Sequence, residues 1–242
     1  MLVSLPTPTY WTALVFRSKE DGEVLYPPPT RGHVFAGAGG GRDPAWTGRF
    51  EIGTPLFQHI TQADKASRAY AAAHSEWKYD LAALAVVLHP EDDISVVGGF
   101  LRVQMRSQNA EPRPIAWSLT PPRLLDGETG SSTIELGVDL KFAKAIIRKD
   151  IPKAARAYIT AFGEQTAEVE WRLRSTVYTK LEGDYKFGAV IRSPLSGANV
   201  GVHLHVEVVR RGRLHAKTFE ADEGLVLSIP ATSSGTPGAD ST

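Results

Sequence analysis

The chain has 242 residues, of which 42% are hydrophobic and 22% charged, and its 27 Lys and Arg balance its 27 Asp and Glu. The balanced charge offers no overall attraction to nucleic acid or to an anionic membrane, so no nucleic-acid partner is expected. The absence of cysteine excludes disulfides, thiolate metal sites and cysteine nucleophiles.

The first segment of the chain predicts no signal peptide. It lacks a basic region at its start, and Pro6 and Pro8 interrupt its apolar run. Together with the missing cysteines, this favours a cytoplasmic location. Frequent Ala, Gly, Pro, Val and Arg suggest a GC-rich bacterial genome as the source.

Several elements are expected in the first third of the chain. Tyr10–Phe16 and Val24–Tyr26 are predicted as strands because they are rich in aromatic and β-branched residues. The glycine-rich stretch 36–44 is predicted as a loop, since no Lys-Ser or Lys-Thr follows it as a phosphate-binding loop requires. Apolar residues spaced three and four apart after the N-cap candidate Thr61 predict one main helix near 62–78.

A hairpin is expected after this helix. Leu81–Leu88 is a continuous apolar run, typical of a strand buried on both faces. The turn His89–Asp93 is predicted to return the chain to a partner strand that begins at Ile94. Gly98-Gly99 suggests a β-bulge in that partner.

The second half alternates apolar and polar residues, as antiparallel strands with one buried face do. The expected strands are Thr133–Phe142, Tyr158–Phe162, Val169–Leu173, Tyr185–Arg192, Val202–Val208 and Leu225–Ile229. This spacing predicts a mainly β fold, either an antiparallel sandwich or a flattened barrel, with the one main helix near 62–78.

The domain organisation stays open at this point. The Pro-, Gly- and Ser-rich stretch 107–132 suggests a boundary between a β-rich N-terminal region, residues 1–110, which holds the helix, and an antiparallel β region, residues 111–230. One continuous domain 1–230 fits the pattern equally well. The tail 231–242 has almost no apolar side chains and is predicted to be disordered.

The sharpest chemical candidate is the pattern His203-Leu204-His205-Val206-Glu207. Side chains alternate along a strand, so His203, His205 and Glu207 share one face. Two imidazoles and a carboxylate there suit zinc or non-haem iron. The opposite face is apolar, however, so these residues point outward, and the main expectation is an exposed polar face with no cofactor. If a metal is bound, the remaining ligand is expected at His215 or in an acidic turn around Asp222.

Other catalytic patterns are weak. The chain has no Gly-x-Ser-x-Gly motif. The carboxylate groups at 91–93 and 220–223 fall in apparent turns, where acidic residues are ordinary. Arginines at outward positions are interleaved with Glu and Asp, which predicts a solvated face and not a surface that binds phosphates. The sequence therefore favours a protein without catalytic activity.

Three functional hypotheses follow. The first is a non-enzymatic interaction module of an intracellular bacterial system, which binds another protein through a sheet face or its long loops. The second is a metal-dependent enzyme centred on His203, His205 and Glu207. The third is a membrane-acting or pore-forming effector, because Thr133–Phe142 has the alternation of a transmembrane strand. Contact with a membrane is not favoured but stays open, and the neutral charge allows a homo-oligomer.

Overall fold

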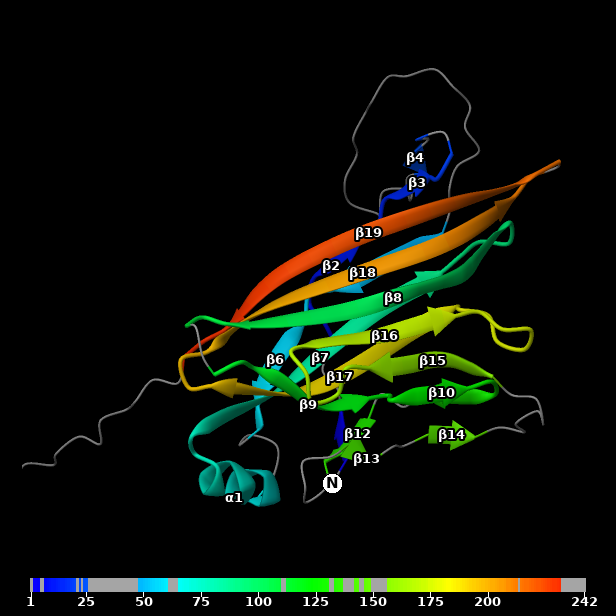
Figure 1. The fold of residues 1–242 in the computed structure, drawn as a ribbon. Coiled ribbons are helices and arrows are strands. Elements are labelled where there is room, and N and C mark those ends of the chain that lie inside the picture. Colours follow the sequence, from blue (N-terminus) through cyan, green and yellow to red (C-terminus); the bar gives the residue numbers. More distant parts are fainter. Residues whose placement is uncertain are drawn as a thin grey trace, which may run out of the picture.

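The computed structural model describes residues 2–4, 7–20, 22, 24–25, 48–60, 65–109, 112–130, 133–136, 142–143, 146–148, 156–212 and 214–231. Among the residues that the structure describes, about two thirds lie in strands, and the one helix is short. Two antiparallel sheets pack against each other and do not close into a barrel, as expected for a β-sandwich (Figure 1). The predicted fold class is therefore confirmed.

The larger sheet, here called sheet 1, has eight strands. Three neighbouring strands at its centre are each 14 residues long. Figure 1 shows these long strands, β8, β18 and β19, running side by side across the molecule. The order is β10 (Arg123–Leu125), β15 (Ala157–Phe162), β16 (Glu168–Arg174), β8 (Ile94–Ser107), β18 (Ala198–Arg211), β19 (Ala216–Ile229), β3 (Phe16–Ser18) and β4 (Val24–Leu25).

Sheet 2 lies behind sheet 1 and is built around β7 and β17. Its order is β2 (Trp11–Ala13), β5 (Arg49–Gly53), β7 (Trp77–His89), β17 (Gly183–Pro194) and β9 (Ile115–Thr120), and β6 (Leu56–His59) also pairs with β7. Both sheets combine strands from residues 1–110 with strands from residues 111–230, and the boundary between these two regions stays a prediction.

Two small sheets lie apart from the sandwich. One joins β1 (Leu2–Ser4), β12 (Thr133–Leu136) and β13 (Phe142–Ala143), and the other joins β11 (Glu128–Gly130) and β14 (Ile146–Arg148). Figure 1 shows β12, β13 and β14 below the edge of the sandwich, beyond β9 and β10. The single helix described, α1 (Lys65–Ala73), lies at the same lower end.

The core lies between the two large sheets and follows the predicted alternation. Val169, Trp171 and Leu173 of β16 are all buried, and Trp171 is fully so. The Trp171 ring lies 5.4 Å from the Phe187 ring of sheet 2, and its Nε1–H donates to the Pro121 carbonyl oxygen at 3.1 Å. Aromatic side chains that are buried with their polar atoms satisfied tie the two layers together.

The predicted hairpin of β7 and β8 is wrong. Both strands exist, and β7 is buried on both faces as expected, but β7 pairs with β5, β6 and β17, whereas β8 pairs with β16 and β18. The turn after His89 carries the chain from sheet 2 to sheet 1. A bulge is present, but it lies one residue before the predicted Gly98-Gly99, because Glu207 lies opposite Gly98 and Val208 opposite Val96, which leaves Val97 as the extra residue. A Cβ on Gly99 would lie 2.3 Å from the His205 carbonyl oxygen, so the close approach of the strands requires glycine there.

Two strand predictions also need correction. Tyr10–Phe16 is not one strand, because β2 belongs to sheet 2 and β3 to sheet 1. Thr133–Phe142 is not one strand either, because β12 and β13 pair antiparallel, with Leu136 opposite Phe142. Alternation alone does not reveal such a reversal, since both arms of a hairpin keep the same period of two.

The helix is shorter than predicted. It ends at Ala73, and Trp77, which lies within the predicted range 62–78, is the first residue of β7. The proposed N-cap Thr61, the glycine-rich stretch 36–44 and the tail from 232 onward lie outside the described residues. In the portion of the chain that the structure describes, no helix has the length and apolar character to span a membrane.

Candidate functional site

The predicted metal ligands lie on the outer face of β18. His203, His205 and Glu207 are half-buried there, while the residues that alternate with them are buried in the core. On β19, Asp222 lies directly opposite His205 and Glu220 directly opposite Glu207. The structure therefore places these acidic residues in a strand, not in the turn that the sequence suggested.

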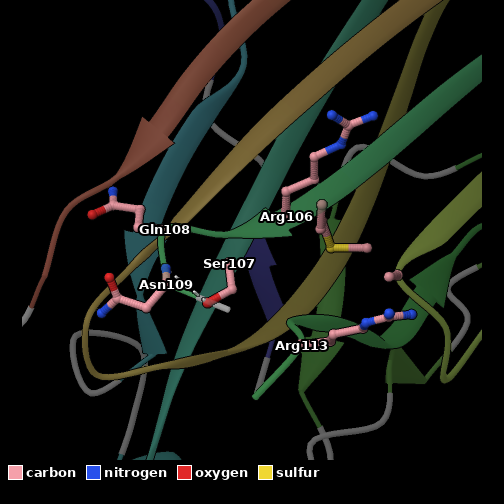
Figure 2. Close-up of a pocket in the computed structure, with 7 residues that line it drawn as sticks. Arg106, Ser107, Gln108, Asn109 and Arg113 are labelled. Atoms are coloured by element: carbon pink, nitrogen blue, oxygen red, sulfur yellow. Dashed lines mark hydrogen bonds between the residues drawn. The ribbon is translucent and has the colours of Figure 1, made fainter. Parts of the chain in front are cut away.

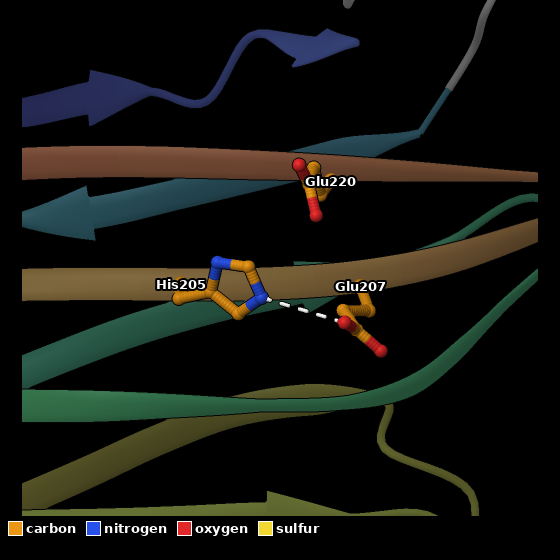
Figure 3. A group of neighbouring side chains, drawn as sticks. All are labelled: His205, Glu207 and Glu220. Atoms are coloured by element: carbon orange, nitrogen blue, oxygen red, sulfur yellow. Dashed lines mark ion pairs between the residues drawn. The ribbon is translucent and has the colours of Figure 1, made fainter. Parts of the chain in front are cut away.

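His205 is held between two carboxylates. Its Nδ1 lies 2.7 Å from Asp222 Oδ1. Its Nε2 lies 3.6 Å from Glu207 Oε1, the ion pair that Figure 3 shows. The Phe100 ring of β8 stacks on the imidazole, with the ring centroids 5.0 Å apart and an angle of 16° between the planes. The ring is thus fixed by contacts on one face and at both nitrogen atoms.

Lys19, which follows β3, joins the two glutamates. Its Nζ lies 2.7 Å from Glu207 Oε1 and 3.4 Å from Glu220 Oε2. The hydrogen bond from Lys19 lowers the pKa of Glu207, and the same bond raises the pKa of Lys19. Both groups therefore stay charged over a wide pH range.

The group that the structure brings together differs from the predicted one. Ligand atoms of His205, Glu207 and Glu220 all lie within 4.8 Å of one another, so Glu220 is added. His203 is not part of this group, and its Nε2 lies 3.3 Å from Asp222 Oδ1. His215 is exposed at the end of the β18–β19 turn. Glu220 could have been found only from the register of β19, which the sequence does not supply.

Two of the outward arginines, Arg102 and Arg172, share one acidic partner, Glu170. Arg102 Nη2 lies 2.7 Å from Glu170 Oε2, and Arg172 Nε lies 2.6 Å from Glu170 Oε1. Burial raises the pKa of Glu170, but these hydrogen bonds outweigh it and the net pKa falls below the ordinary value.

A polar groove of about 530 Å³ opens at the end of β8 (Figure 2). Its seven lining residues offer hydroxyl, amide and guanidinium groups, and no carboxylate or imidazole that would act as a general base is among them. They are Met105, Arg106, Ser107, Gln108, Asn109, Arg113 and Ala167.

A third feature is an excursion of the chain between β10 and β15, residues 127–155, of which the structure describes 127–130, 133–136, 142–143 and 146–148, including β11 to β14. The chain leaves sheet 1 after β10 and returns at β15, and these two strands are paired neighbours. Asp126 and Arg156, here called the neck, hold its ends together. The Asp126 N–H donates to the Arg156 carbonyl oxygen, and the Arg156 N–H donates to the Asp126 carboxylate, both at 2.9 Å.

Asp126 anchors the neck through burial and hydrogen bonds. It is fully buried, and its carboxylate also accepts a hydrogen bond from the Thr176 hydroxyl. Burial raises the pKa of Asp126, but the hydrogen bonds from Thr176 and the Arg156 backbone outweigh it, so the net pKa lies below the ordinary value of 3.8. The first residues of the excursion are fixed too, since the Tyr158 hydroxyl donates to the Glu128 carbonyl oxygen at 2.6 Å.

The comparisons with known proteins give no family. No family model and no curated protein matches the chain. Among solved structures, the Clostridium perfringens delta-toxin has a TM-score of 0.35 and 7% identity, over 76% of this chain and 85% of that chain. A structure named as a pore forming protein has a TM-score of 0.30 and 8% identity, over 78% and 87%. The Clostridium perfringens NetB toxin in its membrane inserted form has a TM-score of 0.31 and 9% identity, over 90% and 95%.

These names contradict the expected cytoplasmic location, which is withdrawn. Two of the proteins are toxins, the third is a pore forming protein, and one of the toxins was solved in a membrane inserted form. TM-scores of 0.30 to 0.35 describe a general likeness of β architecture and assign no function.

Proposed function

We propose that this protein acts on membranes by inserting the excursion 127–155 as a β-hairpin. The observation that carries the proposal is the placement of this segment. Its strands belong to neither large sheet, and its two ends meet at the neck between paired strands. The excursion can therefore detach while the hydrogen bonds within both large sheets stay intact.

The two strand pairs within the excursion are nested as the arms of one hairpin would be, although they belong to separate small sheets. Glu128 lies opposite Arg148 in the β11–β14 pair, and Leu136 lies opposite Phe142 in the β12–β13 pair. The arm from Glu128 to Leu136 is as long as the ~9–11 residues that a transmembrane strand needs. In the sequence of β12, Ile134 and Leu136 alternate with Thr133 and Glu135, which would give this part of the arm a lipid-facing side and a water-facing side.

One hairpin is not sufficient to form a pore. A membrane strand must have its backbone groups paired on both sides, so the strands have to close into a ring. Closure takes about eight strands or more, hence hairpins from several copies of the chain. The balanced net charge adds little repulsion between copies, which agrees with the homo-oligomer allowed by the sequence.

Dye release from lipid vesicles tests this function, and the lack of native cysteine permits a clean cross-link. Val3 of β1 lies opposite Ile134 of β12, so Val3→Cys with Ile134→Cys would tether the excursion to β1 when oxidised. The wild-type chain and the reduced variant should release dye, and the oxidised variant should not.

A matched control separates detachment from the mere presence of a disulfide. Thr129 and Ile147 face each other within the excursion, and a cross-link between cysteines there leaves the hairpin free to move as a unit. This control should release dye in both redox states. The proposal is wrong if the wild-type chain leaves neutral and anionic vesicles intact, or if the oxidised Val3–Ile134 variant releases dye as fast as its reduced form.

A further inference from the structure

The imidazole of His205 is oriented as a metal ligand would be. A neutral ring that donates its Nδ1–H to Asp222, 2.7 Å away, turns the lone pair of Nε2 toward Glu207. Ligating histidines in metal sites commonly donate their other N–H to a carboxylate in this way. The stacked Phe100 ring holds the plane of the imidazole, so little side-chain freedom would be lost on binding.

The two glutamates next to this nitrogen need a cation. Glu207 and Glu220 lie directly opposite each other on β18 and β19, and like charges in such a pair destabilise a sheet. Lys19 is the cation present, and it contacts both carboxylates. With Asp222, the cluster holds three carboxylates against one ammonium, so it carries a charge of about −2 when His205 is neutral.

We propose that His205, Glu207 and Glu220 bind a divalent transition-metal ion, with zinc as the probe, and that Lys19 competes with the ion for the two glutamates. One imidazole and two carboxylates are a usual set of protein ligands for zinc. Their ligand atoms lie within 4.8 Å of one another, and rotation of the flexible glutamates brings them to the ~3.3 Å spacing of a tetrahedral site. Asp222 positions the imidazole and does not bind the ion. This site does not depend on the excursion or on membrane action.

The structure thus exchanges one member of the set that the sequence suggested. His203 contacts Asp222 and lies outside the group, and Glu220 takes its place. The two sets make opposite predictions for single variants. The set suggested by the sequence predicts loss of zinc binding in His203→Gln, and the proposed group predicts it in Glu220→Gln, so these two variants distinguish the sets.

Zinc titration by calorimetry on the untagged full-length chain measures the affinity, and equilibrium dialysis checks the stoichiometry. The wild-type chain should bind one zinc ion. His205→Gln and Glu220→Gln should weaken binding by at least ~100-fold, and Asp222→Asn by about 10–100-fold, the usual effect of losing an orienting carboxylate. Lys19→Met should strengthen binding about tenfold, because the competing ion pairs are partly exposed and modest in strength.

Two control variants complete the experiment. His203→Gln removes a neighbouring imidazole outside the proposed group, and Lys65→Met makes the same charge change on the exposed surface of α1. Both should bind zinc like the wild-type chain. The site is refuted if neither the wild-type chain nor Lys19→Met binds zinc, or if His205→Gln and Glu220→Gln bind it as well as the wild-type chain. Loss of binding in His203→Gln but not in Glu220→Gln would also refute it and would support the set suggested by the sequence.

Discussion

The two large sheets carry lysine–carboxylate pairs in opposite surroundings. On sheet 1, Lys19 and Glu207 form an ion pair at the surface, with side-chain exposures of 39% and 35%. On sheet 2, Lys78 and Asp80 lie 3.5 Å apart with exposures of 9% and 4%, on the face of β7 that also carries the core residues Ala82 and Leu84. The same chemical pair is therefore hydrated in one sheet and desolvated in the other.

This difference in hydration determines how much each pair contributes to the stability of the folded protein. Water screens an exposed pair, so it contributes little to stability and is free to exchange its cation. Forming a buried pair costs the desolvation free energy of both charges, and removing one partner leaves the other charge buried without a counter-ion. The Asp80 Oδ2 atom has no hydrogen-bond partner within the described structure, so that carboxylate is already poorly satisfied.

The core between the sheets should give the largest effect of any single substitution. Trp171→Ala removes a fully buried indole that spans the two layers, and we expect a loss of about 3–5 kcal/mol in the free energy of unfolding. Urea denaturation measures it, with Leu214→Ala, at a side chain 87% exposed, as the control expected to change it by less than ~0.5 kcal/mol. A loss below about 1 kcal/mol for Trp171→Ala would contradict the description of the core.

The buried pair should come next. Lys78→Met leaves Asp80 without its cation in a dry site and removes the hydrogen bond from Lys78 to the Pro230 carbonyl oxygen. We expect a loss of about 3 kcal/mol at pH 8, by urea denaturation. Lys78→Met combined with Asp80→Leu should recover stability to within about 1 kcal/mol of the wild-type chain. If the double variant is as unstable as the single one, an uncompensated charge is not the cause.

The sequence predicted the strands far better than their partners. Period-two alternation located β16 and β18 because each has one exposed and one buried face, but only the last part of β19, Leu225–Ile229, was predicted, and its residues 220–223 were assigned to a turn. It failed where the chain changes sheet, as after His89, because a turn between sheets and a hairpin turn have the same composition. It also failed at Thr133–Phe142, where the chain reverses within a run of unbroken alternation.

The candidate site was predictable only to a limited extent, for the same reason. A single strand brings His205 and Glu207 to one face, and alternation is sufficient to show it. Glu220 and Lys19 reach that face from β19 and from the turn after β3, so their contribution depends on strand register. The neck could not be predicted from the sequence either, because Asp126 and Arg156 are brought together by the pairing of β10 with β15.

The pH dependence of stability distinguishes two of the buried acids, Asp80 and Asp126. Burial raises the pKa of Asp80 above its ordinary value of 3.8, so its penalty appears as the pH rises through that value and is complete above the folded-state pKa. Asp80→Asn should therefore gain stability relative to the wild-type chain as the pH rises from about 4 to 8.

Asp126 has a lowered pKa, so its contribution to stability is complete above pH 3.8 and is lost as the pH falls below that value. Asp126→Asn should lose stability at pH 7 and approach the wild-type chain near pH 2. Chemical denaturation across the pH range checks both, and parallel curves for wild type and Asp80→Asn would contradict the first.

The exposed pair should give the smallest effect and complete the comparison. Lys19→Met makes the same substitution as Lys78→Met, in the sheet where the pair is hydrated. With metal removed by chelation, we expect it to change the free energy of unfolding by no more than about 1 kcal/mol, because each of its two ion pairs is partly exposed. Half of this loss or more should disappear in 1 M salt, where the screening length falls to about 3 Å. The Lys78→Met loss should respond less to salt, since ions do not enter the buried face. Urea denaturation of both variants at low and high salt measures this contrast. Equal losses with equal salt response would mean that Lys19 is as desolvated as Lys78, and the two sheets would then not differ in the way described.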